Sequence, residues 1–430
     1  ATSMIWLLRT PEEGMELTAA TRTRPADFDT YWDHEIAEMN RLVPMGKTLP
    51  RIAKTKAPQK GFVAYCVEIP CTPRPACATL VLPEKAEAKS LPAVVEFCGY
   101  GTSKSGRTCI TNAMYMCVNP HGFADDRSNE DWQRFMHAEG EFGYPYDGWE
   151  SRETCFFHGQ ILRAVRALQW VKTRPEWNGR DLAVTGVSMG GSQSLQAAAL
   201  DRDVTLCVPR DPAMCDHAGL IADPPHRPGW PWILATPRKL PEVQGYGPVD
   251  PALLAISDYF DNVFFAERIT CPVYLATGLA DDVCFSEGVL KAFNATKGPK
   301  NLETDPYNGH CGTRNAAGER LIRVRPAPAK LTVAADGKAL PIVYGKRLTD
   351  DLAAKYLRDC IREMTGIAPR LIPAAQAKDV KEAIFVIADN PPDSERFTTT
   401  VGGGAVRFTG AAHHAAYDFA ERELGVRQYW

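Results

Sequence analysis

The stretch Leu182-Ala-Val-Thr-Gly-Val-Ser188-Met-Gly-Gly191 carries the strongest fold signal in the chain. Its apolar and β-branched start predicts a buried strand, and the GxSxGG turn leads into a helix rich in Ala, Ser, Gln and Leu that ends near Leu200. A turn this tight leaves no room for side chains at Gly186 and Gly190, and it would project the Ser188 hydroxyl above the sheet. The helix amino terminus would then favour negative charge there. The stretch predicts a nucleophilic serine; a chance GxSxG in a glycine-rich loop is the alternative.

The segments around this turn alternate between helix and strand patterns. Apolar residues at helical spacing over 161–171 precede it, and strand-like runs follow at Val204–Pro209 and Pro272–Thr277. This alternation predicts an α/β fold with a doubly wound, mostly parallel sheet. The intervening segment, about 212–251, is rich in Pro, Gly, Trp and His, and we expect it to form a cap or a pocket loop. Within it, the candidate substrate-pocket residues are His217, Trp230 and Trp232.

The chain before residue 150 follows a different pattern. A helix is predicted over Phe28–Leu42, where apolar residues recur at three- and four-residue spacing until Pro44 ends the pattern. Strand-like runs follow at Gly61–Ile69, Ala76–Leu82 and Ala93–Phe97, separated by turns that carry Pro and Lys. These turns predict hairpin-type connections at the front of the sheet.

A second, smaller domain is predicted after the first domain, which we assign to residues 1–322. Residues 323–330 contain a Pro-Ala segment that reads as a short stiff linker. The remaining segment, 331–430, predicts a small α/β module, with one helix that begins at Thr349 as N-cap and ends at Gly366. The other elements expected in it are strands at Leu331–Ala334, Ile342–Tyr344, Ala383–Ala388 and Val406–Thr409, and a closing helix.

A nucleophilic serine needs a base and an orienting acid, which in such a fold follow it in the order Ser, Asp or Glu, His. Asp281 lies just beyond the strand that ends at Thr277, where parallel sheets hold their ligands, and we prefer it to its neighbour Asp282. His310 follows another predicted strand in a Gly-bearing loop. We therefore predict a catalytic triad of Ser188, Asp281 and His310. Three further histidines remain candidates for the pocket or for solvent-facing positions: His158, His217 and His226.

An oxyanion hole needs two backbone amide donors. One donor follows the nucleophile, which makes it the N–H of Met189. The other comes from a loop after an earlier strand, and the turn Phe97-Cys-Gly-Tyr100-Gly fits that place. We predict the N–H of Tyr100 as the second donor; an ordinary glycine turn is the alternative.

The composition and charge of the chain limit the classes of partner that we expect. The 430 residues include 49 basic and 52 acidic side chains, a formal charge of −3 without long runs of either sign, so we expect no nucleic-acid partner. No apolar run is long enough to span a membrane, and Ala1–Thr10 lacks the apolar core of a signal peptide.

The thirteen cysteines contain no CxxC pair, and we expect no metal or organic cofactor. Most cysteines lie in apolar runs; a local disulfide among Cys66, Cys71 and Cys77 stays open.

Together these features resemble the acetyl xylan esterase and cephalosporin C deacetylase family of α/β hydrolases over roughly residues 24–320. Two departures stand out: Val187 and Met189 flank the serine where the family usually has Gly and Gln, and Cys98 replaces a His. Because the oxyanion hole uses backbone amides, these exchanges preserve its chemistry. The matching motifs are Phe28-Asp-Thr-Tyr-Trp32, Cys98-Gly-Tyr100, Ala164-Val-Arg-Ala167, Tyr259-Phe-Asp261, the Gly-Leu-Ala before Asp281, and Gly309-His310.

The resemblance implies a serine carbohydrate esterase that removes O-acetyl groups from acetylated xylan or xylo-oligosaccharides through an acyl-enzyme. The alternatives are a broad small-ester hydrolase similar to cephalosporin C deacetylase and a non-catalytic carbohydrate-binding protein. The family resemblance also implies a homo-oligomer. Polymeric xylan would require a secreted or periplasmic enzyme, so the compartment stays open. The tail from about residue 329 resembles the small α/β domain that precedes the barrel of α-glucuronidases and family 20 hexosaminidases, for which we expect a non-catalytic role.

Overall fold

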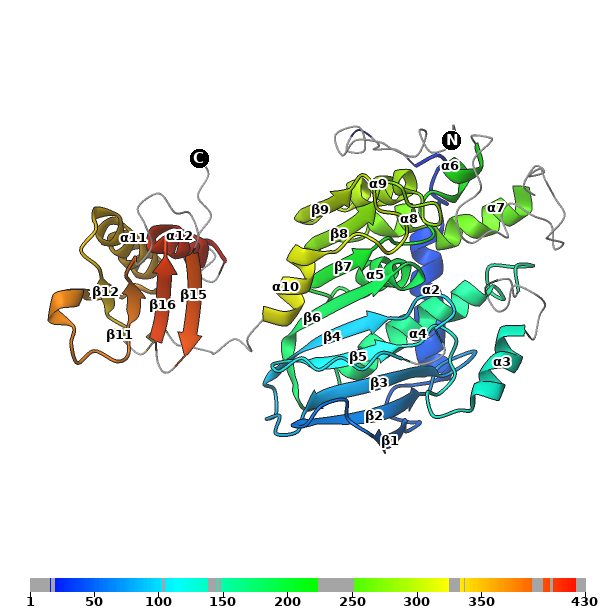
Figure 1. Cartoon of the computed structure of the whole chain (residues 1–430), viewed down its shortest axis with the longest axis horizontal. Coiled ribbons are helices and arrows are strands. Elements are labelled where there is room, and N and C mark those ends of the chain that lie inside the picture. Colours follow the sequence, from blue (N-terminus) through cyan, green and yellow to red (C-terminus); the bar gives the residue numbers. More distant parts are fainter. Residues whose placement is uncertain are drawn as a thin grey trace. The chain divides into compact units, whose positions relative to one another are not determined.

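The computed structural model describes most of the chain as two compact units, residues 1–327 and 328–430. Each unit has its own sheet and its own hydrophobic core (Figure 1). None of the described helices combines the length and apolar composition needed to cross a membrane. The described residues are 16, 20–102, 105–137, 145, 148–222, 251–324, 333–335, 337–388, 397–402 and 405–422.

The first unit is built on a nine-stranded sheet with the order β1-β2-β3-β5-β4-β6-β7-β8-β9. The strands β1, β2, β3 and β5 pair antiparallel, and every pair from β5 through β4 to β9 is parallel. The bounds are β1 Arg51–Thr55, β2 Phe62–Ile69, β3 Ala76–Pro83, β4 Leu91–Phe97, β5 Met114–Val118, β6 Trp177–Val187, β7 Leu206–Arg210, β8 Val273–Gly278 and β9 Lys300–Asp305. The predicted mostly parallel α/β sheet is confirmed.

Helices cover both faces of this sheet. The larger core lies on the face that packs against α2, α4, α5, α8 and α9, and the smaller one lies on the face beneath α10 (Figure 1). Because each inner strand alternates its side chains between two covered faces, the central strands are apolar on both sides. The helices are α2 Phe28–Leu42, α3 Asn129–His137, α4 Phe156–Val171, α5 Met189–Leu200, α6 His217–Ala222, α7 Pro251–Ser257, η4 Asp258–Phe260, α8 Asn262–Ala266, α9 Ser286–Ala295 and α10 Ala316–Val324.

Helix α2 lies across the core face because one side of it is aromatic. Phe28 and Trp32 are completely buried. The Phe28 ring contacts Phe265 edge-on at 4.9 Å between centroids, and the Trp32 Nε1 donates to Tyr259 O. The predicted helix Phe28–Leu42 is therefore confirmed, and its aromatic residues bind it to the segment around α8.

The hairpin prediction for the front of the sheet is only partly right. Strands β2 and β3 are antiparallel neighbours, as expected from the turn between them. Strand β1, which pairs antiparallel with β2, was not predicted. The next strand along the chain, β4, does not pair with β3, because β5 lies between them. The connection from β3 to β4 therefore passes over one strand, and β5, whose sequence Met-Tyr-Met-Cys-Val is not β-branched until its last residue, was not predicted.

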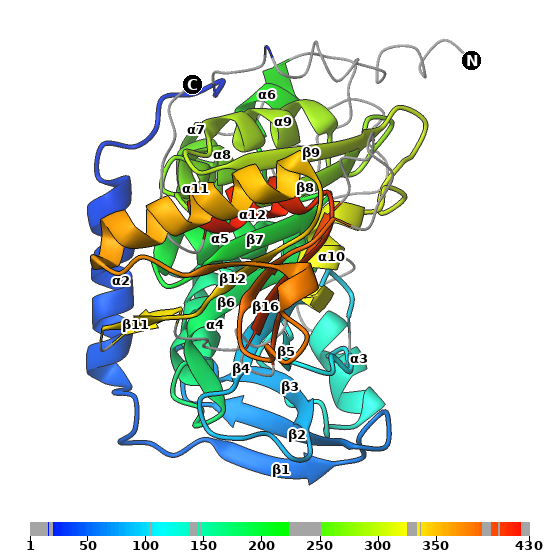
Figure 2. The ribbon, with the colours of Figure 1, turned by 90° about the vertical axis from the view of Figure 1, so that its left-hand side faces the viewer.

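The second unit has a five-stranded sheet in the order β13-β12-β14-β16-β15, parallel except for β15, and a two-stranded β10–β11 ribbon. The helices α11 and α12 share one core with one face of the larger of these sheets (Figure 2). The bounds are β10 Ala334–Ala335, β11 Lys338–Ala339, β12 Ile342–Tyr344, α11 Leu348–Thr365, β13 Leu371–Pro373, η5 Ala374–Gln376, β14 Ile384–Val386, β15 Phe397–Gly402, β16 Ala405–Gly410 and α12 Ala412–Arg422.

The predicted start of α11 is wrong by two residues. The N-cap is Arg347 in an extended conformation, and no side chain caps the helix, so Thr349 lies within its first turn. The predicted end is confirmed, because Gly366 adopts the left-handed conformation with φ 73° and its N–H donates to Arg362 O.

Candidate active site

The turn between β6 and α5 has the backbone geometry of a nucleophile elbow. Ser188 links the two elements with φ 59° and ψ −121°, a combination that L-residues rarely adopt and that marks stored strain at functional sites. A Cβ on Gly190 would overlap Phe97 O, and a Cβ on Gly186 would lie 2.5 Å from the backbone of Gly190. The two glycines predicted from the sequence are therefore required by close backbone packing.

The two residues predicted to supply oxyanion donors lie on either side of this elbow. Because Met189 is the first residue of α5, its N–H has no acceptor within the helix. The residue is completely buried. Tyr100 follows β4 in a turn that packs on the elbow, where a Cβ on Gly99 would lie 3.4 Å from Val187 O. Gln193 of α5 ties the turn down by donating from Nε2 to Cys98 O.

Asp281 and His310 are brought together by direct contact. The Nδ1 atom of His310 lies 2.8 Å from Asp281 Oδ2, while Asp281 Oδ1 accepts from the N–H groups of Val283 and Cys284 at 2.8 and 2.9 Å. Asp281 is completely buried, whereas its neighbour Asp282 is exposed. The structure therefore pairs His310 with the acid that the sequence favoured, and the backbone fixes the orientation of that acid.

The surroundings of His310 favour its charged form. Burial opposes the charge, but the hydrogen bond with Asp281 and the nearby thiols of Cys284 and Cys311 outweigh it and raise the pKa of His310. Burial raises the pKa of Cys284 to about 11, and hydrogen bonds to His310 and Ser188 act in the opposite direction. Within the described residues no hydrogen bond joins Ser188 Oγ to His310, a contact that commonly tightens only in substrate complexes.

A second buried carboxylate, Asp211, was not predicted. It follows β7 with φ 42° and is completely buried. Its Oδ1 accepts from the N–H of Gly278 at 3.0 Å and its Oδ2 from the N–H of Cys311 at 3.1 Å, so one side chain joins the loop of Asp281 to the loop of His310. Burial is the main cause that raises the pKa of Asp211 to about 6. The signal that could have found it is the one that found Asp281, a carboxylate directly after a parallel strand.

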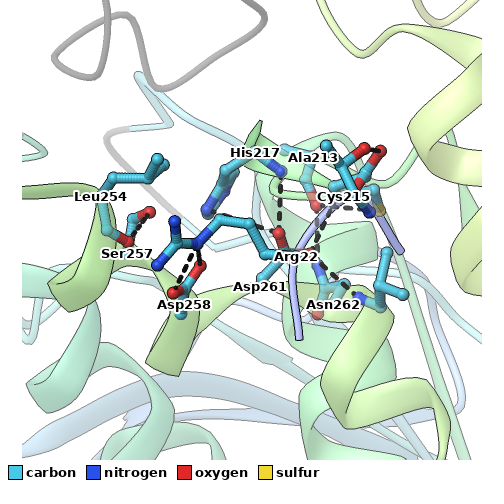
Figure 3. A network of polar contacts seen from close by, with 12 residues as sticks. Arg22, Ala213, Cys215, His217, Leu254, Ser257, Asp258, Asp261 and Asn262 are labelled. Carbon is cyan, nitrogen blue, oxygen red and sulfur yellow. Dashed lines mark hydrogen bonds and ion pairs between the residues drawn. The ribbon is translucent and has the colours of Figure 1, made fainter. Parts of the chain in front are cut away.

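Only some of the predicted pocket residues lie within the part of the chain that the structure describes. His217 begins α6 and is completely buried; its backbone N–H donates to Asp261 Oδ2, and its Nδ1 lies 3.8 Å from the same atom (Figure 3). Neither ring nitrogen has a hydrogen-bond partner among the described residues. Trp230 and Trp232 lie outside the described residues. His158, the other described candidate, pairs through Nε2 with Glu35 at 2.8 Å and joins α4 to α2.

The open cysteine question is answered by the structure. All thirteen cysteines are free thiols, so no disulfide joins Cys66, Cys71 or Cys77. Most of them are buried, as their apolar neighbourhoods predicted, while Cys311 is exposed beside His310. Asp281, Cys284 and His310 are the three side chains of the site that could together bind a metal ion.

A mostly parallel α/β sheet that presents a serine elbow beside a hydrogen-bonded pair of a buried Asp and a partly exposed His is the architecture of the α/β hydrolases. Comparison with known proteins narrows the class. The model of the acetyl xylan esterase family (AXE1), a family of carboxylic ester hydrolases that act on acetylated carbohydrates, matches residues 8–325, and the chain belongs to this family.

Individual relatives agree with this assignment. The chain is 28% identical over 309 residues to the acetyl esterase Axe7A of Xylanibacter ruminicola; the match covers 69% of this chain and 66%, just under two thirds, of that protein. The solved acetyl xylan esterase of Paenibacillus sp. R4 is 23% identical with a TM-score of 0.59, and acetyl xylan esterase 1 of Thermoanaerobacterium sp. JW/SL YS485 is 20% identical with 0.57. Each likeness covers 73% of this chain and 98% of the solved one and shows a shared fold.

Proposed function

We propose that this chain is a serine esterase that removes O-acetyl groups from acetylated xylan or xylo-oligosaccharides. The observation that carries the proposal is the strained Ser188 turn beside the direct Asp281–His310 pair, within a chain of the acetyl xylan esterase family. The names of the relatives, an acetyl esterase and two acetyl xylan esterases, support acetyl as the acyl group and xylan as the substrate.

The proposed reaction has two steps. His310 takes the proton of Ser188 as its oxygen attacks the acetyl carbonyl, and the sugar hydroxyl leaves with that proton. Water then attacks the acetyl-enzyme with His310 again as base, which releases acetate and restores Ser188. Asp281 holds the His310 ring through Nδ1 and stabilises its positive charge during both steps.

The backbone stabilises the negative oxygen of each tetrahedral intermediate. We assign the donors to the N–H groups of Met189 and Tyr100. Met189 lies at the positive end of α5, whose twelve residues direct their peptide dipoles towards the developing charge. Because these donors are held in place before the reaction, they need no reorganisation when the charge develops.

Two alternatives make different predictions for substrate choice. We expect faster acetate release from acetylated xylo-oligosaccharides than from aryl esters with longer acyl chains, measured as kcat/KM with one enzyme preparation. A preference for acyl chains longer than acetyl would contradict the proposal and support a broad small-ester hydrolase. Binding of xylo-oligosaccharides without hydrolysis of any ester would instead support a carbohydrate-binding protein.

The second unit is proposed to have no part in the chemistry. Ser188, Asp281, His310, Met189 and Tyr100 all lie in the first unit. We propose an accessory role for residues 328–430, such as contact with sugar, and self-association of the whole chain into a homo-oligomer, which light scattering of the full chain would test.

A further inference from the structure

Three side chains of the site lie close enough together to share one ion. Asp281, Cys284 and His310 each offer a ligand atom, and these atoms all lie within 4.8 Å of one another. Among the described residues this is the one such group of His, Cys, Asp and Glu side chains. The catalytic roles proposed above use Asp281 and His310, but they give no task to the Cys284 thiol.

The donor set has a definite chemical preference. A thiolate, an imidazole and a carboxylate are the three ligand types that proteins use for Zn²⁺, at bond lengths of about 2.0 to 2.3 Å. Ligand atoms at the corners of such a tetrahedron lie ~3.5 Å apart, so modest side-chain rotations would bring these three to that spacing. Hard ions such as Mg²⁺ prefer oxygen ligands only, and the sulfur of Cys284 disfavours them.

The surroundings hold two of the ligands in place and leave a path to the third. Asp281 is completely buried and fixed by two backbone N–H groups, and Cys284 is only 4% exposed. The His310 side chain is 22% exposed, so an ion can reach the group from solvent through that side. Ser188 and His310 both lie close enough to Cys284 to lower the pKa of its thiol, which places the thiol beside the nucleophile as well as the base.

We propose that Cys284, His310 and Asp281 form an inhibitory site for Zn²⁺ or a similar thiophilic divalent cation. The ion replaces the proton of the Cys284 thiol and one ring proton of charged His310. Both protons leave to solvent, and the ion takes the lone pairs that they free. A histidine with both nitrogens occupied cannot accept the proton of Ser188, so ester hydrolysis stops while the ion is bound. The inhibitory effect rests on the proposed esterase function; the binding of the ion does not.

The chain supplies a matched control. Cys311 is also a thiol next to His310, and it is more exposed than Cys284, but it does not belong to the three-residue group. A site built by the group requires Cys284 and not Cys311. Non-specific binding to accessible thiols would show the opposite order.

The experiment is a zinc titration of ester hydrolysis by wild type, Cys284→Ser and Cys311→Ser, each normalised to its own activity in chelator. We expect the zinc concentration for half-inhibition to rise at least about tenfold in Cys284→Ser, since loss even of an outer partner of a metal site costs about 10- to 100-fold in affinity. Cys311→Ser should match wild type. Equal inhibition of wild type and Cys284→Ser, or no inhibition of wild type, would overturn the proposal.

A second measurement does not depend on catalysis. Cd²⁺ bound by a thiolate absorbs in the ultraviolet through charge transfer, so we expect one equivalent of Cd²⁺ to give a band with wild type and Cys311→Ser that is lost in Cys284→Ser. If the protein hydrolyses no ester, this band still supports the metal site while the esterase proposal fails. A band that survives unchanged in Cys284→Ser would place the ion on another cysteine and refute the site.

Discussion

Asp211 offers a sharp test of how the acid and the base are held. Its carboxylate accepts one hydrogen bond from the loop of Asp281, at Gly278 N, and one from the loop of His310, at Cys311 N. Asn has the same shape but only one acceptor oxygen, so Asp211→Asn keeps one of these bonds and turns an amide group against the other N–H. The side chain at position 211 would then hold only one of the two loops and would no longer link them.

The expected effect on stability is small because two contributions offset each other. Losing one charge-assisted hydrogen bond costs about 1.5 to 3 kcal/mol. The buried charge of Asp211 has the opposite effect: its pKa is raised from 3.8 to about 6, so ionisation destabilises the folded state by ~3 kcal/mol above pH 6. Asn removes that cost. We expect unfolding free energies of the two proteins to agree at pH 8 within ~2 kcal/mol.

The pH dependence of this comparison has a definite sign. Between about pH 4 and 6 the folded wild type binds more protons at Asp211 than the unfolded chain, so this group makes folding less favourable as the pH rises. The variant has no such group. The stability of wild type relative to Asp211→Asn should therefore decrease by ~2 kcal/mol from pH 4.5 to pH 8 in urea unfolding, because about 1.5 pH units separate the starting pH from the pKa of Asp211.

Activity should respond far more than stability. A misplacement of ~1 Å can cost about 100-fold, so we expect kcat/KM for an aryl acetate to fall ~10- to 100-fold in Asp211→Asn at pH 8. The control is Asp181→Asn, because that carboxylate bonds to Asn178 and Arg180 at the end of β6 remote from Ser188. Activity of Asp211→Asn within twofold of wild type would show that the loops need no link through this residue.

Two further predictions concern the base and the elbow. In Asp281→Asn the hydrogen bond that raises the pKa of His310 is lost. The midpoint of the acid limb of kcat/KM, which we expect above 6.5 in wild type, should therefore move to lower pH, and the maximum should fall by ~10⁴, as for the same change in another triad enzyme. An unmoved midpoint would exclude His310 as the titrating base. In Gly190→Ala the new methyl overlaps Phe97 O and should lower both the melting temperature and the activity. The control Gly309→Ala, whose Cβ meets only Ala280 O at 3.6 Å, should melt near the wild-type temperature. Equal melting temperatures of the two variants would contradict the packing argument.

Local patterns in the sequence predicted most strands of the first unit and its helices α2, α4 and α5, whereas its other helices were not predicted. The aromatic spacing of Phe28–Leu42 gave helix α2 at its observed bounds, and the run from Leu182 gave strand, turn and helix in order. Strand β5 was missed although Tyr115 and Val118 favour strands, because a short apolar run shows no periodicity that assigns it to a strand; it is defined by pairing with β3 and β4. The crossing of β3 to β4 follows from that same long-range pairing, which no local pattern encodes.

Some residues of the site could also be predicted from the sequence, and others could not. Asp281 and His310 were found because chain order and position after a strand select them, and the structure joins them directly. Asp211 has the same kind of position, but its importance depends on which two loops its oxygens reach. Cys284 was indistinguishable from the other buried cysteines until its neighbours Ser188 and His310 were known. Contacts between distant loops are therefore the part that needed the structure.

The central claim is that Ser188 carries the acetyl group, and acetate release from acetylated xylo-oligosaccharides tests it most directly. We expect wild type to release acetate and Ser188→Ala to be slower by about 10⁶, the loss seen when a comparable triad loses its serine. Ser194→Ala, which removes a hydroxyl that donates to Gly190 O within α5, is the matched control and should remain active. Release by Ser188→Ala at the wild-type rate would contradict the account.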